Sequence, residues 1–178
     1  HVRLEFLGLD TYADVFLNET RILTADNMFR RWAAEVKPLL KERGNVLRVY
    51  FHSPINKALP QYESLPYRYE AWNDQADNGG LDGKKLSPFT RKAGYHYGWD
   101  WGPRLVTSGI WRPVKLQGWN ELRLEDVFHR QTEVSSEAAR VETQVEIEAA
   151  APVENAVVTV SDGKRVLGSR SVQLHAGM

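Results

Sequence analysis

Apolar or β-branched residues recur at every second position in several short runs of this sequence. The runs 2–6, 46–51 and 141–148 all show this period. Because residues i and i+2 lie on the same face of an extended strand, the period predicts half-buried β-strands. Polar turn residues at 18–20 and 161–164 join further extended runs, as in hairpins. The pattern therefore predicts an all-β chain.

Composition narrows the classes of function. The 178 residues are 42% hydrophobic, which is enough for one large β domain or one and a half smaller ones. The formal net charge of zero gives no electrostatic reason to expect nucleic acid or a membrane surface as a partner. Without cysteine, the chain has no disulfide and no thiol chemistry. Its five histidines lack metal-ligand spacing, so we expect neither a metal nor a cofactor.

The character of the sequence changes between residues 52 and 88. Pro54, Pro60 and Pro66 interrupt this stretch, residues 74–80 are rich in Asp, Asn and Gly, and no clear periodicity is present. A loop of this length is uncommon in a compact domain unless it has a function. We interpret the stretch as an excursion at a domain interface or a pocket rim. A partly disordered insertion is the alternative.

The most distinctive segment is residues 91–104. Two tryptophans flank Asp100, a glycine stands on either side of this triplet, and Pro103 follows, which predicts an ordered loop. Indole faces pack on the C–H face of a sugar ring, and a carboxylate between them can accept two hydroxyl hydrogen bonds. The segment is therefore typical of carbohydrate binding. Alternatively, Trp99 and Trp101 cap a hydrophobic core and Asp100 closes an Asx turn.

Residues 91–104, followed by Gly-Ile-Trp-Arg-Pro at 109–113, resemble the hallmark loop in the N-terminal domain of β-mannosidases of glycoside hydrolase family two. The stretches 9–18, 26–32 and 45–49 agree in order, and the resemblance extends to about Gly118. It implies a jelly-roll-like (galactose-binding-like) β-sandwich over residues 1–119 and the start of an immunoglobulin-like β-sandwich over residues 120–178. It also implies that the catalytic barrel, with its two glutamates, lies outside this sequence.

The resemblance assigns roles to five residues. Asp100 is expected to bind the outer hydroxyls of a terminal mannose, Trp99 to line the pocket, and Trp101, Arg91 and Tyr95 to support the loop. A retaining glycosidase needs two carboxyl groups about 5 Å apart, and Asp100 has no such partner in its loop, so no catalytic residue is expected here.

The parent enzyme would hydrolyse terminal, non-reducing β-mannose with retention, and this chain alone would be inactive. Its partners would be the β-mannoside and the catalytic barrel of the same polypeptide. A periplasmic or lysosomal location would fit the resemblance.

Three alternatives remain open from the sequence. The chain could be the same region of a β-glucuronidase or β-galactosidase, a free-standing carbohydrate-binding module, or a purely structural adhesion-type sandwich. Among the remaining polar residues, we expect His96 to form a local hydrogen bond and the alternating glutamates at 142–148 to form a solvated strand face. We expect Arg30, Arg31 and the pair at 91–92 to contribute dispersed surface charge.

Overall fold

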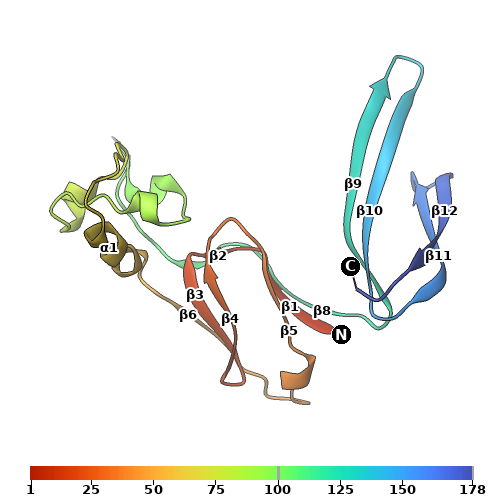
Figure 1. Cartoon of the computed structure of the whole chain (residues 1–178), viewed down its shortest axis with the longest axis horizontal. Helices are drawn as coiled ribbons and strands as arrows, with labels where there is room; N and C mark the ends of the chain where they lie inside the picture. The colour runs from red at the N-terminus through yellow and green to blue at the C-terminus, as the bar shows by residue number, and fades with distance from the viewer. Residues whose placement is uncertain (100, 178) are drawn as a thin grey trace. The chain divides into compact units, whose positions relative to one another are not determined.

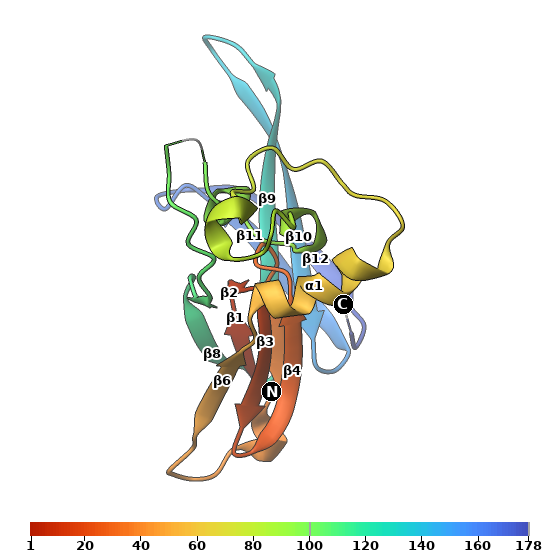
Figure 2. The same cartoon turned by 90° about the vertical axis from the view of Figure 1, so that its left-hand side faces the viewer.

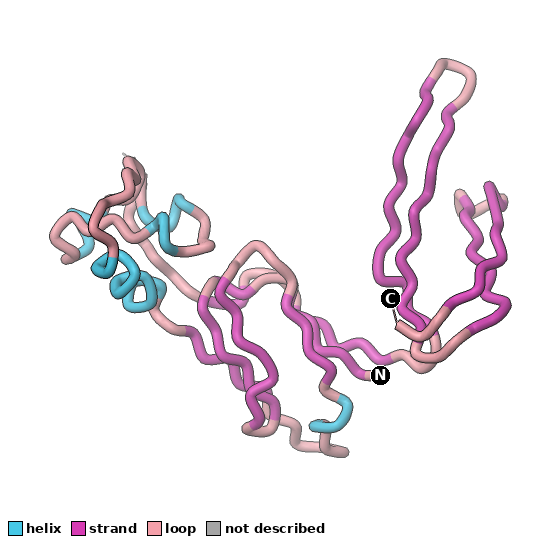
Figure 3. Tube along the Cα trace, in the orientation of Figure 1, coloured by secondary structure: helices cyan, strands magenta, loops and turns pink. Residues whose placement is uncertain are grey.

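The structure is a computed structural model that describes residues 1–99 and 101–177, without the side chains of residues 78 and 79. It divides into two compact units: Val2–Gln117, and Gly118–Met178 together with His1. Strands, in magenta, occur in both units in Figure 3, and the described helices, in cyan, all belong to the first unit. The prediction of an all-β chain is confirmed.

The first unit contains two three-stranded sheets and a small two-stranded one (Figure 1). The larger sheets have the strand orders β5-β1-β8 and β4-β3-β6, and the small sheet pairs β2 with β7. The strands are β1 (Val2–Phe6), β2 (Leu9–Asp10), β3 (Tyr12–Leu17), β4 (Thr20–Asp26), β5 (Trp32–Glu35), β6 (Leu47–Phe51), β7 (Gly109–Ile110) and β8 (Val114–Gly118).

The core of this unit is built from both of the larger sheets. Leu4 and Phe6 of β1 belong to the same buried cluster as Val15 and Leu17 of β3, as the sandwich requires. Val36 follows β5 and is also fully buried, just before a short 3-10 helix, η1 (Lys37–Leu39). The alternation in the sequence therefore marks the inner faces of the strands.

Residues 52–88 form a folded subdomain-like excursion, and the prediction of an aperiodic loop is wrong there. The excursion contains α1 (Pro54–Ser64) and the 3-10 helices η2 (Ala76–Gly79) and η3 (Ser87–Phe89). Ser53 caps α1 by accepting a hydrogen bond from the Asn56 N–H at 3.2 Å, and Pro54 occupies the first turn, where proline is favoured. Pro60 lies inside the helix. A proline at this position is the reason why the sequence did not suggest a helix here.

The excursion packs at the end of the sheet where β6 leaves it, as Figures 1 and 2 show from two sides. The His52 N–H donates to the Tyr12 carbonyl oxygen at 2.9 Å, and Tyr12 Oη donates to the Phe89 carbonyl oxygen at 3.3 Å. A second core fixes the excursion internally, with Ala58 of α1 and Leu86 buried together. Its position is therefore set by hydrogen bonds to β3 and by its own apolar contacts.

The second unit consists of two antiparallel hairpins. One pairs β9 (Leu122–Val134) with β10 (Ala139–Ala149), and the other pairs β11 (Val153–Ser161) with β12 (Val166–Leu174). The turn of the second hairpin is closed by Asp162, whose Oδ1 accepts hydrogen bonds from the N–H groups of Lys164 and Arg165, both at 2.9 Å. The hairpin predicted around the turn at 161–164 is thus confirmed.

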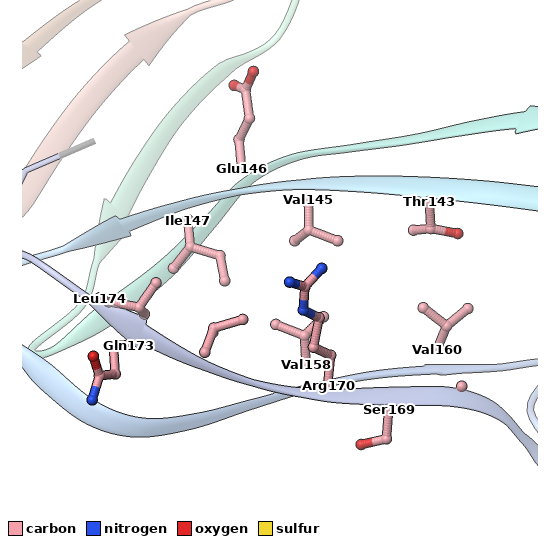
Figure 4. Close-up of a pocket in the computed structure, with 12 residues that line it drawn as sticks. Thr143, Val145, Glu146, Ile147, Val158, Val160, Ser169, Arg170, Gln173 and Leu174 are labelled. Atoms are coloured by element: carbon pink, nitrogen blue, oxygen red, sulfur yellow. The ribbon is translucent and has the colours of Figure 1, made fainter.

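Apolar faces of the two hairpins line a groove of about 910 Å³. Figure 4 shows Val145 and Ile147 of β10 pointing across this groove toward Val158 and Leu174, while Glu146 points away. Facing β-branched side chains on two hairpins are typical of the interior between two sheets. The alternation at 141–148 therefore marks an apolar face that lines this groove.

Candidate functional site

We call residues 91–113 the arm. Both of its ends are attached to the main chain of Met28. The Met28 N–H donates to the Arg91 carbonyl oxygen at 3.0 Å, and Trp111 Nε1 donates to the Met28 carbonyl oxygen, also at 3.0 Å. A Cβ atom on Gly8 would lie 2.4 Å from Trp111 Nε1, so the indole ring needs a glycine at that position. The arm therefore leaves and re-enters the sandwich at one place.

Lys92 fixes the first part of the arm. Its side chain is completely buried, and Nζ donates hydrogen bonds to Asp10 Oδ2 and, at 2.7 Å, to the Thr107 carbonyl oxygen. Burial lowers the pKa of the Lys92 ammonium, while Asp10 opposes that change. Asp10 also accepts a hydrogen bond from Thr11 Oγ1. The expectation that Lys92 is dispersed surface charge is wrong, because its carboxylate partner lies 82 residues earlier in the chain.

His96 lies on η4 (Gly94–Tyr97) and joins the two legs of the arm. Its Nδ1 is 3.3 Å from the Leu105 carbonyl oxygen and 3.2 Å from Thr107 Oγ1, so the predicted local hydrogen bond is confirmed. Its Nε2 lies 3.7 Å from Asp10 Oδ2. Tyr95 stacks on the imidazole, with ring centroids 4.6 Å apart. Asp10, Tyr95, His96 and Thr107 help to line a hollow of about 200 Å³ at the base of the arm.

Tyr97 anchors the leg that leads into the tryptophan segment. Its ring is fully buried with Ala58 and Leu86, and burial raises the pKa of its hydroxyl to about 12. The Gln75 N–H donates to the Tyr97 carbonyl oxygen at 2.8 Å. Gly98 follows with φ +102°, and a Cβ there would lie 2.6 Å from Gln75 Cγ. Only glycine fits this position without strain.

Trp99 and Trp101 belong to a turn that is closed by backbone hydrogen bonds between Trp99 and Gly102. The N–H of Trp99 donates to the carbonyl oxygen of Gly102 at 3.3 Å, and the N–H of Gly102 donates back at 3.2 Å. The ring centroids of Trp99 and Trp101 are 6.5 Å apart, and the side chains are 42% and 86% exposed. Trp101 therefore does not cap a core within this unit. Asp100, for which a sugar-binding role is predicted, lies outside the described residues.

Arg104 holds the leg that leads out of the turn. Its Nε donates to Asp74 Oδ1 at 3.4 Å, and the side chains of Arg104 and Asp74 are 8% and 0% exposed. The other oxygen of Asp74 accepts hydrogen bonds from the N–H groups of Leu86 and Ser87, at 2.8 and 2.9 Å. The excursion is therefore connected directly to the arm.

Residues 1–112 match the family described as "Glycosyl hydrolase 2 galactose-binding domain-like". The chain belongs to this family. The predicted resemblance to glycoside hydrolase family two is confirmed, and so is the galactose-binding-like fold of the first unit.

Several relatives of this family-two domain are mannosidases. Over 126 residues the chain is 43% identical to "Beta-mannosidase B" of Thermothelomyces thermophilus, a match that covers 70% of the chain and 14% of that protein. It is 35% identical to the β-D-mannosidase of Dictyoglomus thermophilum, with a TM-score of 0.77 over 99% of the chain and 21% of that structure. The chain thus spans about a fifth of the length of these relatives, or less.

A third comparison shows how widely the fold is shared. The β-D-glucuronidase of Dictyoglomus thermophilum superposes on 96% of the chain and 26% of its own length, with a TM-score of 0.55. Its sequence identity is 14%, so the likeness concerns the fold alone.

In the family-two domain, the side chains that anchor the arm are not the ones that were predicted to support the loop. Arg91 holds the base of the arm through its carbonyl oxygen, and Tyr95 and Trp101 are exposed. The buried side chains that hold the arm are those of Lys92, Tyr97 and Arg104, the last of which pairs with Asp74. The sequence analysis did not predict any of them as a support. The signal for these anchors was the presence of two cationic side chains and an aromatic ring in a glycine-rich segment. Such side chains need partners when a loop is ordered.

Two buried carboxylates of the family-two domain each lie next to a cation. Asp10 pairs with Lys92, and Asp74 pairs with Arg104. Over residues 1–99 and 101–177, no three side chains of His, Cys, Asp or Glu gather as a metal site. None of the helices in that part of the chain is long and apolar enough to cross a membrane. What the site offers chemically is a firmly held turn with two exposed indole rings.

Proposed function

We propose that this chain is the non-catalytic N-terminal region of a retaining exo-β-mannosidase, and that the turn at 99–102 completes the subsite for the terminal mannose. The supporting observation is the exposed pair Trp99 and Trp101 on a turn held by buried groups, in a chain with relatives named β-mannosidase. Residues 1–119 would be the sugar-binding-like sandwich, and residues 120–178 the start of an immunoglobulin-like domain. The two catalytic glutamates would lie on the enzyme's barrel.

In this proposal the turn contributes specificity. Trp99 provides an apolar wall for the C–H face of the sugar, and the Asp100 carboxylate accepts hydrogen bonds from its outer hydroxyl groups. A sugar that left this carboxylate unpaired in a closed subsite would bind the transition state less tightly. The natural partners are thus the β-mannoside and the barrel domain of the same enzyme.

The test is a substitution in the full-length enzyme. Asp100→Ala is expected to lower kcat/KM for nitrophenyl β-mannoside by an amount that corresponds to about 2–4 kcal/mol of transition-state binding, because a charged hydrogen-bond partner is lost. Asp126→Ala, at an exposed position of β9, is the matched control and should leave kcat/KM unchanged. Unchanged turnover in the Asp100 variant would favour a purely structural sandwich.

Because β-glucuronidases share the fold, the substrate itself needs a comparison. Hydrolysis of nitrophenyl β-mannoside, β-glucuronide and β-galactoside by the full-length enzyme is expected to favour the mannoside. A preference for either of the other two would overturn the proposed substrate.

The exposed indole rings also fit a free-standing carbohydrate-binding module. That alternative predicts measurable binding of mannose by the isolated chain. We expect no binding tighter than about millimolar in calorimetry, because one turn supplies too few contacts.

A further inference from the structure

The tryptophan turn has little structure of its own. Two mutual backbone hydrogen bonds between Trp99 and Gly102 close it, and its indole rings project with large exposed areas. Such a turn does not hold a fixed direction by itself, so its orientation must come from the residues on its two legs. These are Tyr97, two positions before the turn, and Arg104, two positions after it.

Both legs are bound to the same short piece of the excursion. Arg104 pairs with Asp74, and the neighbouring Gln75 donates its N–H to the carbonyl oxygen of Tyr97. The guanidinium carbon of Arg104 also lies 5.6 Å from the centroid of the Tyr97 ring, within reach of a cation–π interaction. The two legs are therefore linked to each other as well as to the excursion.

Asp74 is at the centre of this arrangement. One of its oxygens binds Arg104, and the other accepts hydrogen bonds from the N–H groups of Leu86 and Ser87 at the start of η3. Its own N–H donates to the carbonyl oxygen of Ala71 at 3.1 Å. These partners hold the buried carboxylate in place, and it contacts the Arg104 guanidinium through one hydrogen bond from Nε.

We propose that Asp74 is a positioning residue for sugar binding, acting through Arg104 to set the direction of the turn that carries Trp99 and Trp101. The inference rests on the function proposed above. The inference also gives residues 52–88 a role, because the excursion then sets the orientation of the turn. Asp74 itself would not touch the sugar.

The experiment uses the full-length enzyme with Asp74→Asn. The amide oxygen can still accept hydrogen bonds from Leu86 and Ser87, but the charge that holds Arg104 is lost. Backbone hydrogen exchange, followed by mass spectrometry over residues 95–105, should become roughly tenfold faster or more. The value of kcat/KM for nitrophenyl β-mannoside should fall roughly ten- to hundredfold, since small displacements of positioning groups have effects of that size.

A matched control separates this effect from a general loss of charge. Glu63→Gln removes the partner of Lys84, which forms an exposed ion pair in the same excursion at 3.2 Å. We expect this variant to leave both hydrogen exchange over 95–105 and kcat/KM unchanged. Equal effects in the control and in Asp74→Asn would contradict the inference.

A combined variant distinguishes positioning from mere stability. When Trp99→Ala and Asp100→Ala have already removed the sugar contacts of the turn, adding Asp74→Asn should lower kcat/KM by less than about twofold more. A full additional loss would show that Asp74 acts on the fold rather than through the turn. If Asp74→Asn does not fold, Arg104→Lys takes its place, because it keeps the charge but loses the planar group over Tyr97; unchanged exchange in that variant would overturn the inference.

The outcomes also separate this inference from the proposed function. Unchanged mannoside turnover in Trp99→Ala would contradict the proposed function. Impaired turnover in Trp99→Ala, together with unaltered exchange and turnover in Asp74→Asn, would contradict only the positioning role.

Discussion

Both compact units contain ion pairs between neighbouring segments, but they place them differently. In the first unit, the pair formed by Lys92 and Asp10 is buried beneath the arm. In the second unit, the side chains of Arg130 and Glu142, which join β9 to β10, are 66% and 65% exposed. A buried pair is strongly destabilising to break, whereas an exposed pair contributes little. The buried Lys92–Asp10 pair therefore fixes a particular chain path, whereas the exposed Arg130–Glu142 pair contributes little to holding β9 against β10.

Glycines at turns show the same contrast. Gly98 and Gly163 both have positive φ, at +102° and +87°. A Cβ at Gly98 would collide with the Gln75 side chain, while the space around Gly163 is open. The turn in the first unit is thus constrained by its surroundings, and the hairpin turn in the second only by its own backbone. The comparison teaches that tertiary contacts hold the arm, whereas local contacts are enough for the hairpins.

The largest expected effect tests the buried pair. Lys92→Met should lower the free energy of unfolding of the first unit by about 3–5 kcal/mol, because it leaves the Asp10 carboxylate buried with its main partner gone. Arg130→Met should change the free energy of unfolding of the second unit by less than about 1 kcal/mol. Urea unfolding of the chain, followed by circular dichroism, measures both.

A double variant sharpens this prediction. Adding Asp10→Leu to Lys92→Met removes both charges and should recover part of the lost stability. Equal, small effects of Lys92→Met and Arg130→Met would contradict the conclusion that the buried pair matters more for stability than the exposed one.

An intermediate effect is expected at the two glycines. Gly98→Ala should destabilise the first unit by about 2–3 kcal/mol, because backbone strain and a steric clash add together. Gly163→Ala should cost only about 1 kcal/mol. Thermal unfolding monitored by tryptophan fluorescence and circular dichroism measures the two changes. Replacing Gln75 by glycine in the Gly98→Ala background should restore part of the stability, and no recovery would show that the clash is not the cause.

The smallest effect concerns acid. A hydrogen bond with His52, at 2.7 Å, holds the pKa of Asp14 below its ordinary value of 3.8. A depressed pKa means that the unfolded chain binds more protons, so Asp14 stabilises the fold above its unfolded pKa, and this contribution is lost as the pH falls through the folded value. Asp14→Asn should therefore make the unfolding free energy of the first unit less dependent on pH below about 4.

Asp162 provides the matched case in the second unit. Backbone hydrogen bonds from Arg165 and Lys164 lower the pKa of this exposed carboxyl group. Asp162→Asn keeps an acceptor oxygen for the turn, so the hairpin should form at neutral pH while its acid sensitivity falls. Circular dichroism between pH 2 and 7 would check both variants, and a steeper acid dependence in either one would contradict the assigned cause.

The sequence predicted most of the strands but not the helix α1. The runs 2–6 and 141–148 lie in observed strands, and the run 46–51 contains β6, because a period of two is a local property that every strand with one buried face shows. The same period could not be found in the excursion, since Pro60 interrupts α1 and the buried Ala58 of the helix packs in a core that includes the distant residues Leu86 and Tyr97. Ser53 followed by Pro54 was the readable signal for its start.

The sequence by itself determined the family and the segment that carries the tryptophans, because both depend on residue identity and order. Only the tertiary structure decided how that segment is held. Lys92 meets a carboxylate 82 residues away and Arg104 one 30 residues away, and Tyr97 is buried by α1 and Leu86. Periodicity describes one element at a time, whereas the burial of a charge depends on which distant segments surround it, so these anchors could be recognised only once the chain was folded.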